Sequence, residues 1–262
     1  MIKLISKTYS EVNIMKLGAQ FYSIRDNTTT PEDLKNAFKK IKEIGYEIAQ
    51  MSAICAIDPE LLKSYTEEFD LPITCTHSPY DRIVNDTDKL IEEHKIYGCP
   101  TIGLGAMPEE FRGENVYKFV QIIKDPIAKI KAAGLNFAYH NHAFEFEAVD
   151  GKLIYDILID ELPDLDFIID TYWVKYAGYD YLEYIKKIGA KRIKNVHLKD
   201  MASEPKGEIC PCGEGVIDFA PVVKLCDEMG IENALVEQDN APDTNDSIGQ
   251  MRISYNNLKS LF

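Results

Sequence analysis

Residues 17–51 read LGAQFYSIRDNTTTPEDLKNAFKKIKEIGYEIAQM and contain a complete strand-helix-strand unit. The apolar runs Leu17–Tyr22 and Tyr46–Met51 predict two strands. Between them, Thr30 is a suitable helix N-cap and Pro31 suits the first helical position. Two strands separated by a helix of this length indicate parallel neighbours in one sheet.

The same alternation continues to the C-terminus. Further strands are predicted at Leu71–His77, Thr101–Leu104, Leu135–His140, Asp166–Asp170, Ile193–Leu198 and Ala234–Glu237. Further helices are predicted to begin at Asp58 and to span about Asp86–Tyr97, Glu114–Ala133, Leu153–Glu161, Tyr179–Ile188, Asp218–Met229 and Asp246–Leu261. Eight such units in about 248 residues favour an α/β fold of the closed (β/α)8 TIM barrel type. An open doubly wound sheet is the alternative, but residues 23–27 lack the glycines of its usual first turn.

The first part of the chain differs from this pattern. Residues 1–14 carry several charged and hydroxyl side chains and lack the continuous apolar run of a signal peptide. We expect them to form an N-terminal extension outside a single barrel domain at residues 15–262. No stretch approaches the roughly 18 apolar residues of a membrane span. The six cysteines are scattered, which is typical of reduced thiols, so a cytoplasmic location is expected.

The charge balance restricts the kind of partner. The chain has 29 Lys and Arg against 43 Asp and Glu, and its formal net charge is -14. Binding to nucleic acid relies on clustered cations that displace counterions from phosphates, so this function is disfavoured. Association between copies of the chain stays open, because no predicted helix has a clearly apolar outer face.

Polar residues follow almost every predicted strand, at the end where a TIM barrel places its active site. They are Gln20 and Ser23, Gln50, His77, His140 and His142, Asp170, His197, Lys199 and Asp200, and Glu237 and Asp239. The fourth strand, which ends at Leu104, offers no such side chain. Four of the five histidines lie at strand ends, and only His94 falls in a predicted helix, where we expect it at the surface.

Because residues two apart in a strand point to the same side, the inward-facing strand ends can converge. The residues that would meet in this way are His140, Asp170, His197 and Glu237. Two imidazoles and two carboxylates suit Zn²⁺, Mn²⁺ or another divalent ion. The alternative is that each of the four is a hydrogen-bonded polar residue at the barrel mouth.

Six stretches together resemble one known family. They are residues 17–25 (LGAQFYSIR), 139–142 (YHNH), 169–173 (IDTYW), 196–200 (VHLKD), 213–219 (GEGVIDF) and 236–239 (VEQD). In this order they resemble the xylose isomerase-like TIM barrels, which include sugar-phosphate isomerases and epimerases, over nearly the whole chain from Met15.

The resemblance implies a divalent metal (Mn²⁺, Mg²⁺, Zn²⁺ or Co²⁺) bound by residues at the ends of strands five to eight. Asp170, His197 and Glu237 match the family pattern directly. At the fifth strand the family usually has Glu, whereas this chain has His140, with Glu145 five residues later. Either residue could complete the metal site.

Side-chain type and strand position suggest roles for further residues in a reaction of this kind. A sugar isomerase removes a proton next to a carbonyl and stabilises the resulting enediolate with a metal. Candidate catalytic residues are Glu237 and Glu145 as bases, His142 as a proton shuttle, and Lys199 beside the developing oxyanion. Candidate substrate-binding residues are Gln20, His77, Trp173 and Asp239. Two alternatives give these residues structural roles only: Trp173 belongs to the core, and Lys199 forms an ion pair with Asp200.

Three classes of enzyme fit these residues. The first is a metal-dependent sugar or keto-sugar isomerase or epimerase. The second is a lyase or dehydratase that uses the same base and metal on an oxidised sugar, glycoside or cyclitol. The third is a zinc-dependent DNA-repair endonuclease, which five histidines and a net charge of -14 disfavour. We therefore expect a small carbohydrate substrate, with the isomerase ranked ahead of the lyase.

Overall fold

A closed barrel of eight parallel strands forms the centre of the computed structural model, which describes residues 15–262. The strands are β1 (Lys16–Gln20), β2 (Ile48–Met51), β3 (Ile73–His77), β4 (Thr101–Leu104), β5 (Asn136–His140), β8 (Asp166–Asp170), β9 (Ile193–Leu198) and β12 (Asn233–Val236). They follow one another around the barrel in sequence order, and β1 pairs with β12 to close it. The predicted TIM barrel is therefore confirmed, whereas the predicted extension at residues 1–14 lies outside the described residues.

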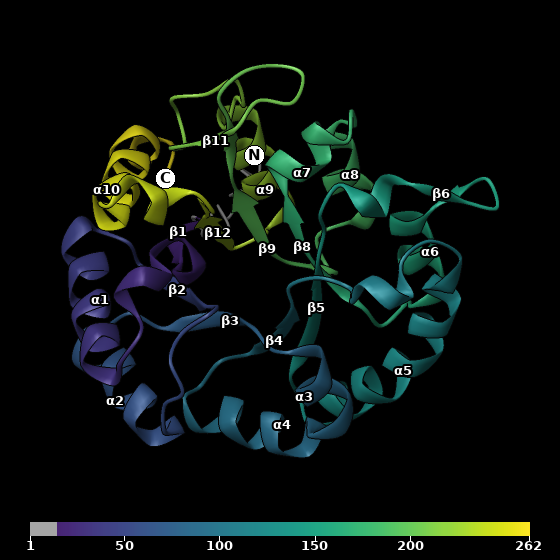
Figure 1. Cartoon of the computed structure of the whole chain (residues 1–262), viewed down its shortest axis with the longest axis horizontal. Coiled ribbons are helices and arrows are strands. Elements are labelled where there is room, and N and C mark those ends of the chain that lie inside the picture. The colour runs from purple at the N-terminus through teal and green to yellow at the C-terminus, as the bar shows by residue number, and fades with distance from the viewer. Residues whose placement is uncertain (1–14) are drawn as a thin grey trace, which may run out of the picture.

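Helices form a ring around the strands (Figure 1). They are α1 (Pro31–Ile44), α2 (Pro59–Glu68), α3 (Tyr80–Asn85), α4 (Thr87–Ile96), α5 (Val116–Ala132), α6 (Ile154–Glu161), α7 (Thr171–Tyr176), α8 (Tyr181–Ile188), α9 (Ala220–Met229) and α10 (Ser247–Leu258). The N-cap predicted for α1 is present, since the Thr30 hydroxyl accepts a hydrogen bond of 3.1 Å from the amide of Asp33. None of the helices in residues 15–262 is long and apolar enough to cross a membrane.

Two short helices, α3 and α7, were not predicted, and the first strand is shorter than expected. Helix α7 begins directly after β8, because the Asp170 carboxylate accepts a hydrogen bond of 3.0 Å from the amide of Trp173. Strand β1 ends at Gln20, whose side chain accepts from the amide of Tyr22 at 2.6 Å and starts a 3-10 turn over Phe21–Asn27. Both differences arise where a polar side chain at a strand end caps the next turn.

Two short hairpins extend from the barrel end that carries the polar strand ends. They pair β6 (Ala148–Val149) with β7 (Lys152–Leu153), and β10 (Asp200–Met201) with β11 (Ile209–Cys210). Figure 1 shows the hairpin at β6 projecting beyond the ring of helices.

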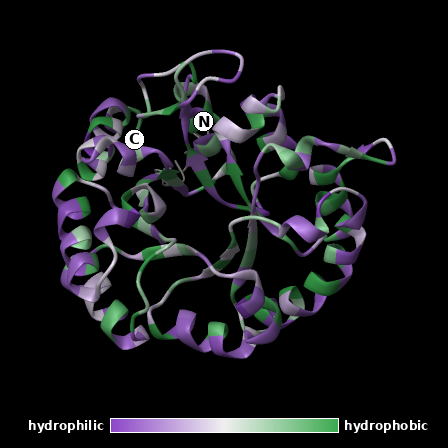
Figure 2. Cartoon of the chain, in the orientation of Figure 1, coloured by the Kyte–Doolittle hydropathy of each residue, from purple (hydrophilic) through white to green (hydrophobic). Residues whose placement is uncertain are grey.

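The core has two parts. Hydrophilic and hydrophobic residues alternate along the ring of helices (Figure 2), as amphipathic helices packed on a barrel require. Inside the barrel, a separate small cluster contains Cys75, Ala138 and Ile168. Each of these lies two positions before a polar residue at the barrel mouth, namely His77, His140 and Asp170. The barrel interior thus supports the strand ends from directly below.

His94 is buried rather than on the helix surface, so that expectation was wrong. Only 1% of the residue is exposed, and its Nδ1 lies 2.7 Å from the carbonyl oxygen of Leu90. Its Nε2 lies 2.9 Å from the hydroxyl of Thr76 in β3. The hydrogen bonds attach α4 to β3, which is why a polar residue occupies an inward helix position.

Replacing His94 by Gln should reduce the acid sensitivity of the fold. Burial lowers the pKa of His94 from 6.5 to about 4, so the folded state prefers the neutral ring. The stability that this preference contributes is present above pH 6.5 and is lost as the pH falls toward 4. Between pH 7.5 and 5 the free energy of unfolding should fall by about 2 kcal/mol more in the native protein than in the variant. Urea unfolding at the two pH values measures this difference, and equal losses in both proteins would contradict it.

Candidate metal centre and active site

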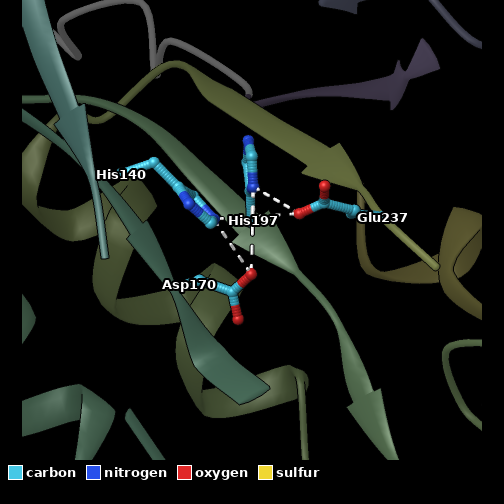
Figure 3. Close-up of side chains that lie close together, drawn as sticks. All are labelled: His140, Asp170, His197 and Glu237. Carbon is cyan, nitrogen blue, oxygen red and sulfur yellow. Dashed lines mark hydrogen bonds and ion pairs between the residues drawn. The ribbon is translucent and has the colours of Figure 1, made fainter. Parts of the chain in front are cut away.

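Four buried side chains meet at the carboxyl ends of the barrel strands (Figure 3). They are His140 from β5, Asp170 from β8, His197 from β9, and Glu237, which follows β12. Each offers one donor atom, and these atoms all lie within 4.8 Å of one another. Asp170 Oδ2 is 3.2 Å from His140 Nε2, and Glu237 Oε2 is 2.8 Å from His197 Nδ1. The residues predicted as metal ligands are therefore brought together.

The two imidazoles are held so that one nitrogen of each faces the cluster. His140 Nδ1 donates to the carbonyl oxygen of Gly105 at 3.0 Å, which leaves Nε2 as the inward acceptor. His197 Nε2 donates to the Oε1 atom of Gln50 at 2.7 Å, which leaves Nδ1 inward. A second-shell hydrogen bond of this kind fixes the tautomer and the ring orientation of a metal-binding histidine.

The two carboxylates are held in the same manner. Asp170 Oδ1 accepts from the amide of Trp173, so only Oδ2 faces the cluster. Glu237 Oε1 accepts from the side-chain amide of Gln20 at 2.9 Å, so Oε2 faces His197. Gln20 thus orients a carboxylate instead of lining the pocket, where the sequence had placed it as a substrate-binding residue.

The donor set fits a divalent ion. Two nitrogen and two oxygen donors are a mixture that Zn²⁺, Mn²⁺ and Co²⁺ accept, at metal-ligand distances of about 2.0–2.2 Å. Burial lowers the pKa of His140 to about 3, so this ring is neutral, as a metal ligand must be. With each outer polar atom already bonded, the four inward atoms are left to contact one another, the amine of Lys199 or an ion.

Lys199 is a fully buried cation beside the cluster. Its Nζ lies 2.7 Å from Asp239, 3.4 Å from Glu237 and 3.7 Å from Asp170. Burial alone would lower the pKa of Lys199, but the three carboxylates raise it above its usual value, so the amine is protonated. Burial alone would likewise raise the pKa of Glu237, but Lys199 and His197 hold it well below its usual value.

A pocket of about 420 Å³ opens above the cluster. Its lining includes the predicted residues His77, His140, His142, Lys199, Glu237 and Asp239, together with Tyr22, Ser52, Ser78 and Tyr80. Ser52 and Ser78 were not predicted as site residues, although each directly follows a strand, β2 and β3, and this position alone marks them as candidates. The volume suits a ligand of the size of one sugar or cyclitol ring.

Two histidines that line this pocket each have a nitrogen without a hydrogen-bond partner. The buried atoms His77 Nε2 and His142 Nδ1 have no hydrogen-bond partner. Burial lowers the pKa of His142 to about 3 and that of His77 well below its usual value, so both rings are neutral. The His142 ring also packs on Trp173, with the ring centroids 5.2 Å apart. Trp173 therefore contacts His142 and Lys199 instead of forming the wall of the pocket.

Glu145 lies outside the cluster. One of its oxygens accepts from the hydroxyl of Tyr139 at 2.5 Å, and the other accepts from the amide of His142 at 2.8 Å. Burial raises the pKa of this carboxyl to about 7. Both oxygens are occupied and Glu145 does not line the pocket, so the geometry favours His140 as the fifth-strand ligand and gives Glu145 the task of holding the His142 backbone.

Asp200 does not pair with Lys199, so that alternative was wrong. Its carboxylate accepts hydrogen bonds of 2.8–3.0 Å from four backbone amides of the following loop. The donors are Met201, Gly213, Gly215 and Ile217. A Cβ atom at Gly215 would lie 2.5 Å from the Asp200 carboxylate, which explains the second glycine of the GEG motif.

Comparison with known proteins agrees with this architecture. A family model described as "Xylose isomerase-like TIM barrel" matches residues 38–253. An inosose dehydratase of Clostridium perfringens is 31% identical, in a match that covers 70% of this chain and 75% of that protein.

Solved structures share the fold over almost the full chain. A sugar phosphate isomerase/epimerase from Parabacteroides distasonis superposes with a TM-score of 0.77 at 22% identity and covers 93% of this chain and 98% of its own. A D-allulose 3-epimerase from Methylomonas sp. superposes with a TM-score of 0.70 at 15% identity and covers 95% of this chain and 99% of its own. At these identities the likeness concerns the fold alone.

Proposed function

Because this chain belongs to the family of xylose isomerase-like TIM barrels, we propose that it is a divalent-metal-dependent dehydratase that acts on a polyhydroxylated ketone, either a keto-cyclitol or a keto-sugar. The observation that carries the proposal is the inward-facing cluster of His140, Asp170, His197 and Glu237 at the floor of an open pocket. The relative at 31% identity, named inosose dehydratase, supports elimination of water over isomerisation. This reverses the order in which the sequence analysis ranked the two reactions.

The cluster would hold the metal, and the metal would act there as a Lewis acid toward the substrate's oxygens. The chain's own contribution begins with Lys199, whose protonated amine lies at the same wall of the pocket. A fixed positive charge in a buried site stabilises negative charge that develops on a carbonyl oxygen when the neighbouring carbon loses its proton.

His142 is the residue placed to move that proton. Its ring is neutral, lines the pocket and has an unpaired nitrogen. In the proposed reaction the carbon-hydrogen bond next to the carbonyl breaks and its proton passes to His142. The bond to the hydroxyl on the next carbon then breaks, and this hydroxyl leaves as water with the proton that His142 returns. Glu145 holds the His142 backbone and so positions the imidazole.

An isomerase or epimerase is the second candidate. Proton transfer between two faces of a carbon needs two bases, and His77 and His142, each with an unpaired nitrogen, both line the pocket. The two candidates share the first step, in which the proton next to the carbonyl is removed. They differ in whether a carbon-oxygen bond breaks afterwards.

The reaction can be followed by proton NMR in D₂O with 2-keto-myo-inositol and with D-fructose, using enzyme loaded with Mn²⁺, Co²⁺, Zn²⁺ or Mg²⁺. Loss of water and a new unsaturated or diketone product support the dehydratase. Deuterium uptake at carbon without loss of water supports the isomerase. The His142→Asn variant should lower the rate by about 100-fold or more in either case. If the protein catalyses no exchange and no elimination with any of these ions, both proposed reactions are wrong.

A further inference from the structure

The lysine that lines the catalytic pocket is committed to acidic partners, and Arg25, beside the lining residue Tyr22, donates to the backbone carbonyls of Tyr22 and Asp239 at 2.8 and 3.0 Å. Lys199, the one lysine or arginine among the described residues that line the catalytic pocket, lies within 3.7 Å of three carboxylates. With a divalent ion bound, Asp170 and Glu237 balance the ion, and Asp239 balances Lys199. The site is then neutral and has no surplus positive charge to offer a phosphate group.

In the cavity next to the catalytic pocket, the positively charged side chain is also paired with acidic residues. It has a volume of about 490 Å³ and shares Ser52, His77, Ser78 and Pro79 with the catalytic pocket. Its guanidinium group, Arg82, binds both oxygens of Glu93 at 3.0 and 3.1 Å and also Asp86 at 3.2 Å. Three of the five N–H donors are thereby used, including both on Nη2, so neither fork of this guanidinium is free to bind a phosphate in the bidentate geometry that arginine uses.

Backbone amides of the seventh-strand loop are also occupied by an acidic side chain. Many TIM barrels bind phosphate on backbone amides of the loops that follow the seventh and eighth strands. In this chain the seventh-strand loop presents such amides at Gly213, Gly215 and Ile217, and the carboxylate of Asp200 already accepts from all three. The Asp200 carboxylate therefore occupies the position that a phosphate would take on these amides.

A chain of hydrogen bonds determines what Ser78 can recognise at the boundary of the two cavities. The Leu90 carbonyl can only accept and lies 2.7 Å from His94 Nδ1, closer than the Tyr97 hydroxyl at 2.9 Å, so we assign the proton to Nδ1, and His94 Nε2 then accepts. The hydroxyl of Thr76 therefore donates to His94 at 2.9 Å, and the hydroxyl of Ser78 donates to Thr76 at 3.0 Å. Ser78 has used its single proton, so it offers only lone pairs to a ligand. These accept from a hydroxyl group and repel a phosphate oxygen.

From these four features we infer that the pocket takes an uncharged, hydroxyl-rich substrate and excludes phosphorylated sugars, and that Ser78 accepts a hydrogen bond from a substrate hydroxyl. The inference rests on the proposed function for the choice of site and adds the substrate class. It separates this chain from the sugar phosphate isomerase/epimerase whose fold it shares.

Calorimetric binding to the Mn²⁺-loaded protein tests the exclusion of phosphate. Two matched pairs of ligands serve as probes, myo-inositol with myo-inositol 1-phosphate and D-fructose with D-fructose 6-phosphate. We expect the phosphorylated member of each pair to bind at least 10-fold more weakly. Equal or tighter binding of a phosphorylated member in either pair would overturn the inference. Because affinity is measured separately from the NMR assay of the reaction, a preserved preference in a protein that does not eliminate water would count against the proposed reaction alone.

The role of Ser78 has its own test. Ser78→Ala should weaken binding of the unphosphorylated ligands by about 3- to 10-fold, the usual effect of one lost neutral hydrogen bond, and should narrow the difference in affinity from the phosphorylated ligands. Thr76→Val removes the acceptor that orients Ser78 and should have part of the same effect. Nitrogen-15 NMR of His94 reports which ring nitrogen is protonated, and it should show the proton on Nδ1. A proton on Nε2 at neutral pH would reverse the direction of the hydrogen bonds from His94 to Ser78 and overturn this role for Ser78.

Discussion

Asp170→Asn and His197→Ala should each remove the metal from the purified protein and lower its activity by more than about 100-fold. Substitutions that only reorient a ligand reduce metal affinity by about 10- to 100-fold, and the loss of a ligand atom should exceed this range. In this cluster each residue offers a single inward atom, so no second atom of the same side chain can replace it. Elemental analysis after reconstitution should give about one ion per native chain and almost none in the variants.

Asp166→Asn is the matched control for this experiment. Asp166 is also a buried aspartate of β8, only 2% exposed, but it lies at the opposite end of the strand. Its substitution tests the general effect of removing a buried carboxylate from this strand, and metal content should stay at the native value. If all three variants retain the ion, or if the native protein binds none of the four metals, the proposed centre is wrong.

Lys199→Met should lower the turnover rate by about 100- to 1000-fold while the protein still binds metal. This is the usual cost of removing one preorganised group that stabilises an oxyanion. The variant also leaves Asp170, Glu237 and Asp239 without their buried counter-ion, so the metal-free protein should lose about 3–5 kcal/mol of stability. Bound metal should restore part of that loss, because it neutralises two of the three carboxylates.

Lys194→Met controls for the loss of a lysine from the same strand. Lys194 also lies in β9, but its side chain is partly exposed and pairs with Asp166 at 3.5 Å, away from the pocket. We expect its turnover rate to equal that of the native enzyme. A Lys199→Met enzyme with native kcat would show that Lys199 has a structural role alone.

The strand order and the polar strand ends could be predicted because both follow from short-range patterns. Strands Thr101–Leu104, Asp166–Asp170 and Ile193–Leu198 have the predicted bounds, since their apolar runs stop at glycine or charged residues. Alternation along each strand was also sufficient to predict that His140, Asp170, His197 and Glu237 would face one another.

What the sequence could not supply depends on contacts between distant segments. Nothing near His94 in the chain reveals that Thr76 lies 2.9 Å from its ring, so a buried histidine was predicted at the surface. The direction of Glu145 depends on Tyr139, six residues earlier, whose hydroxyl draws the carboxylate away from the cluster. Asp200 could equally have paired with Lys199, and only the fold of the loop to Ile217 decides against it.

The small cluster of Cys75, Ala138 and Ile168 inside the barrel has a consequence for how this enzyme could change over evolutionary time. These side chains belong to the packed interior, while the residues two positions further along each strand carry the chemistry. Mutations at the mouth therefore alter what the barrel accepts without disturbing the layer that keeps it folded. Foldability and specificity are encoded at separate positions of the same strands, so a duplicated copy of this gene could acquire a new substrate through a few strand-end and loop substitutions.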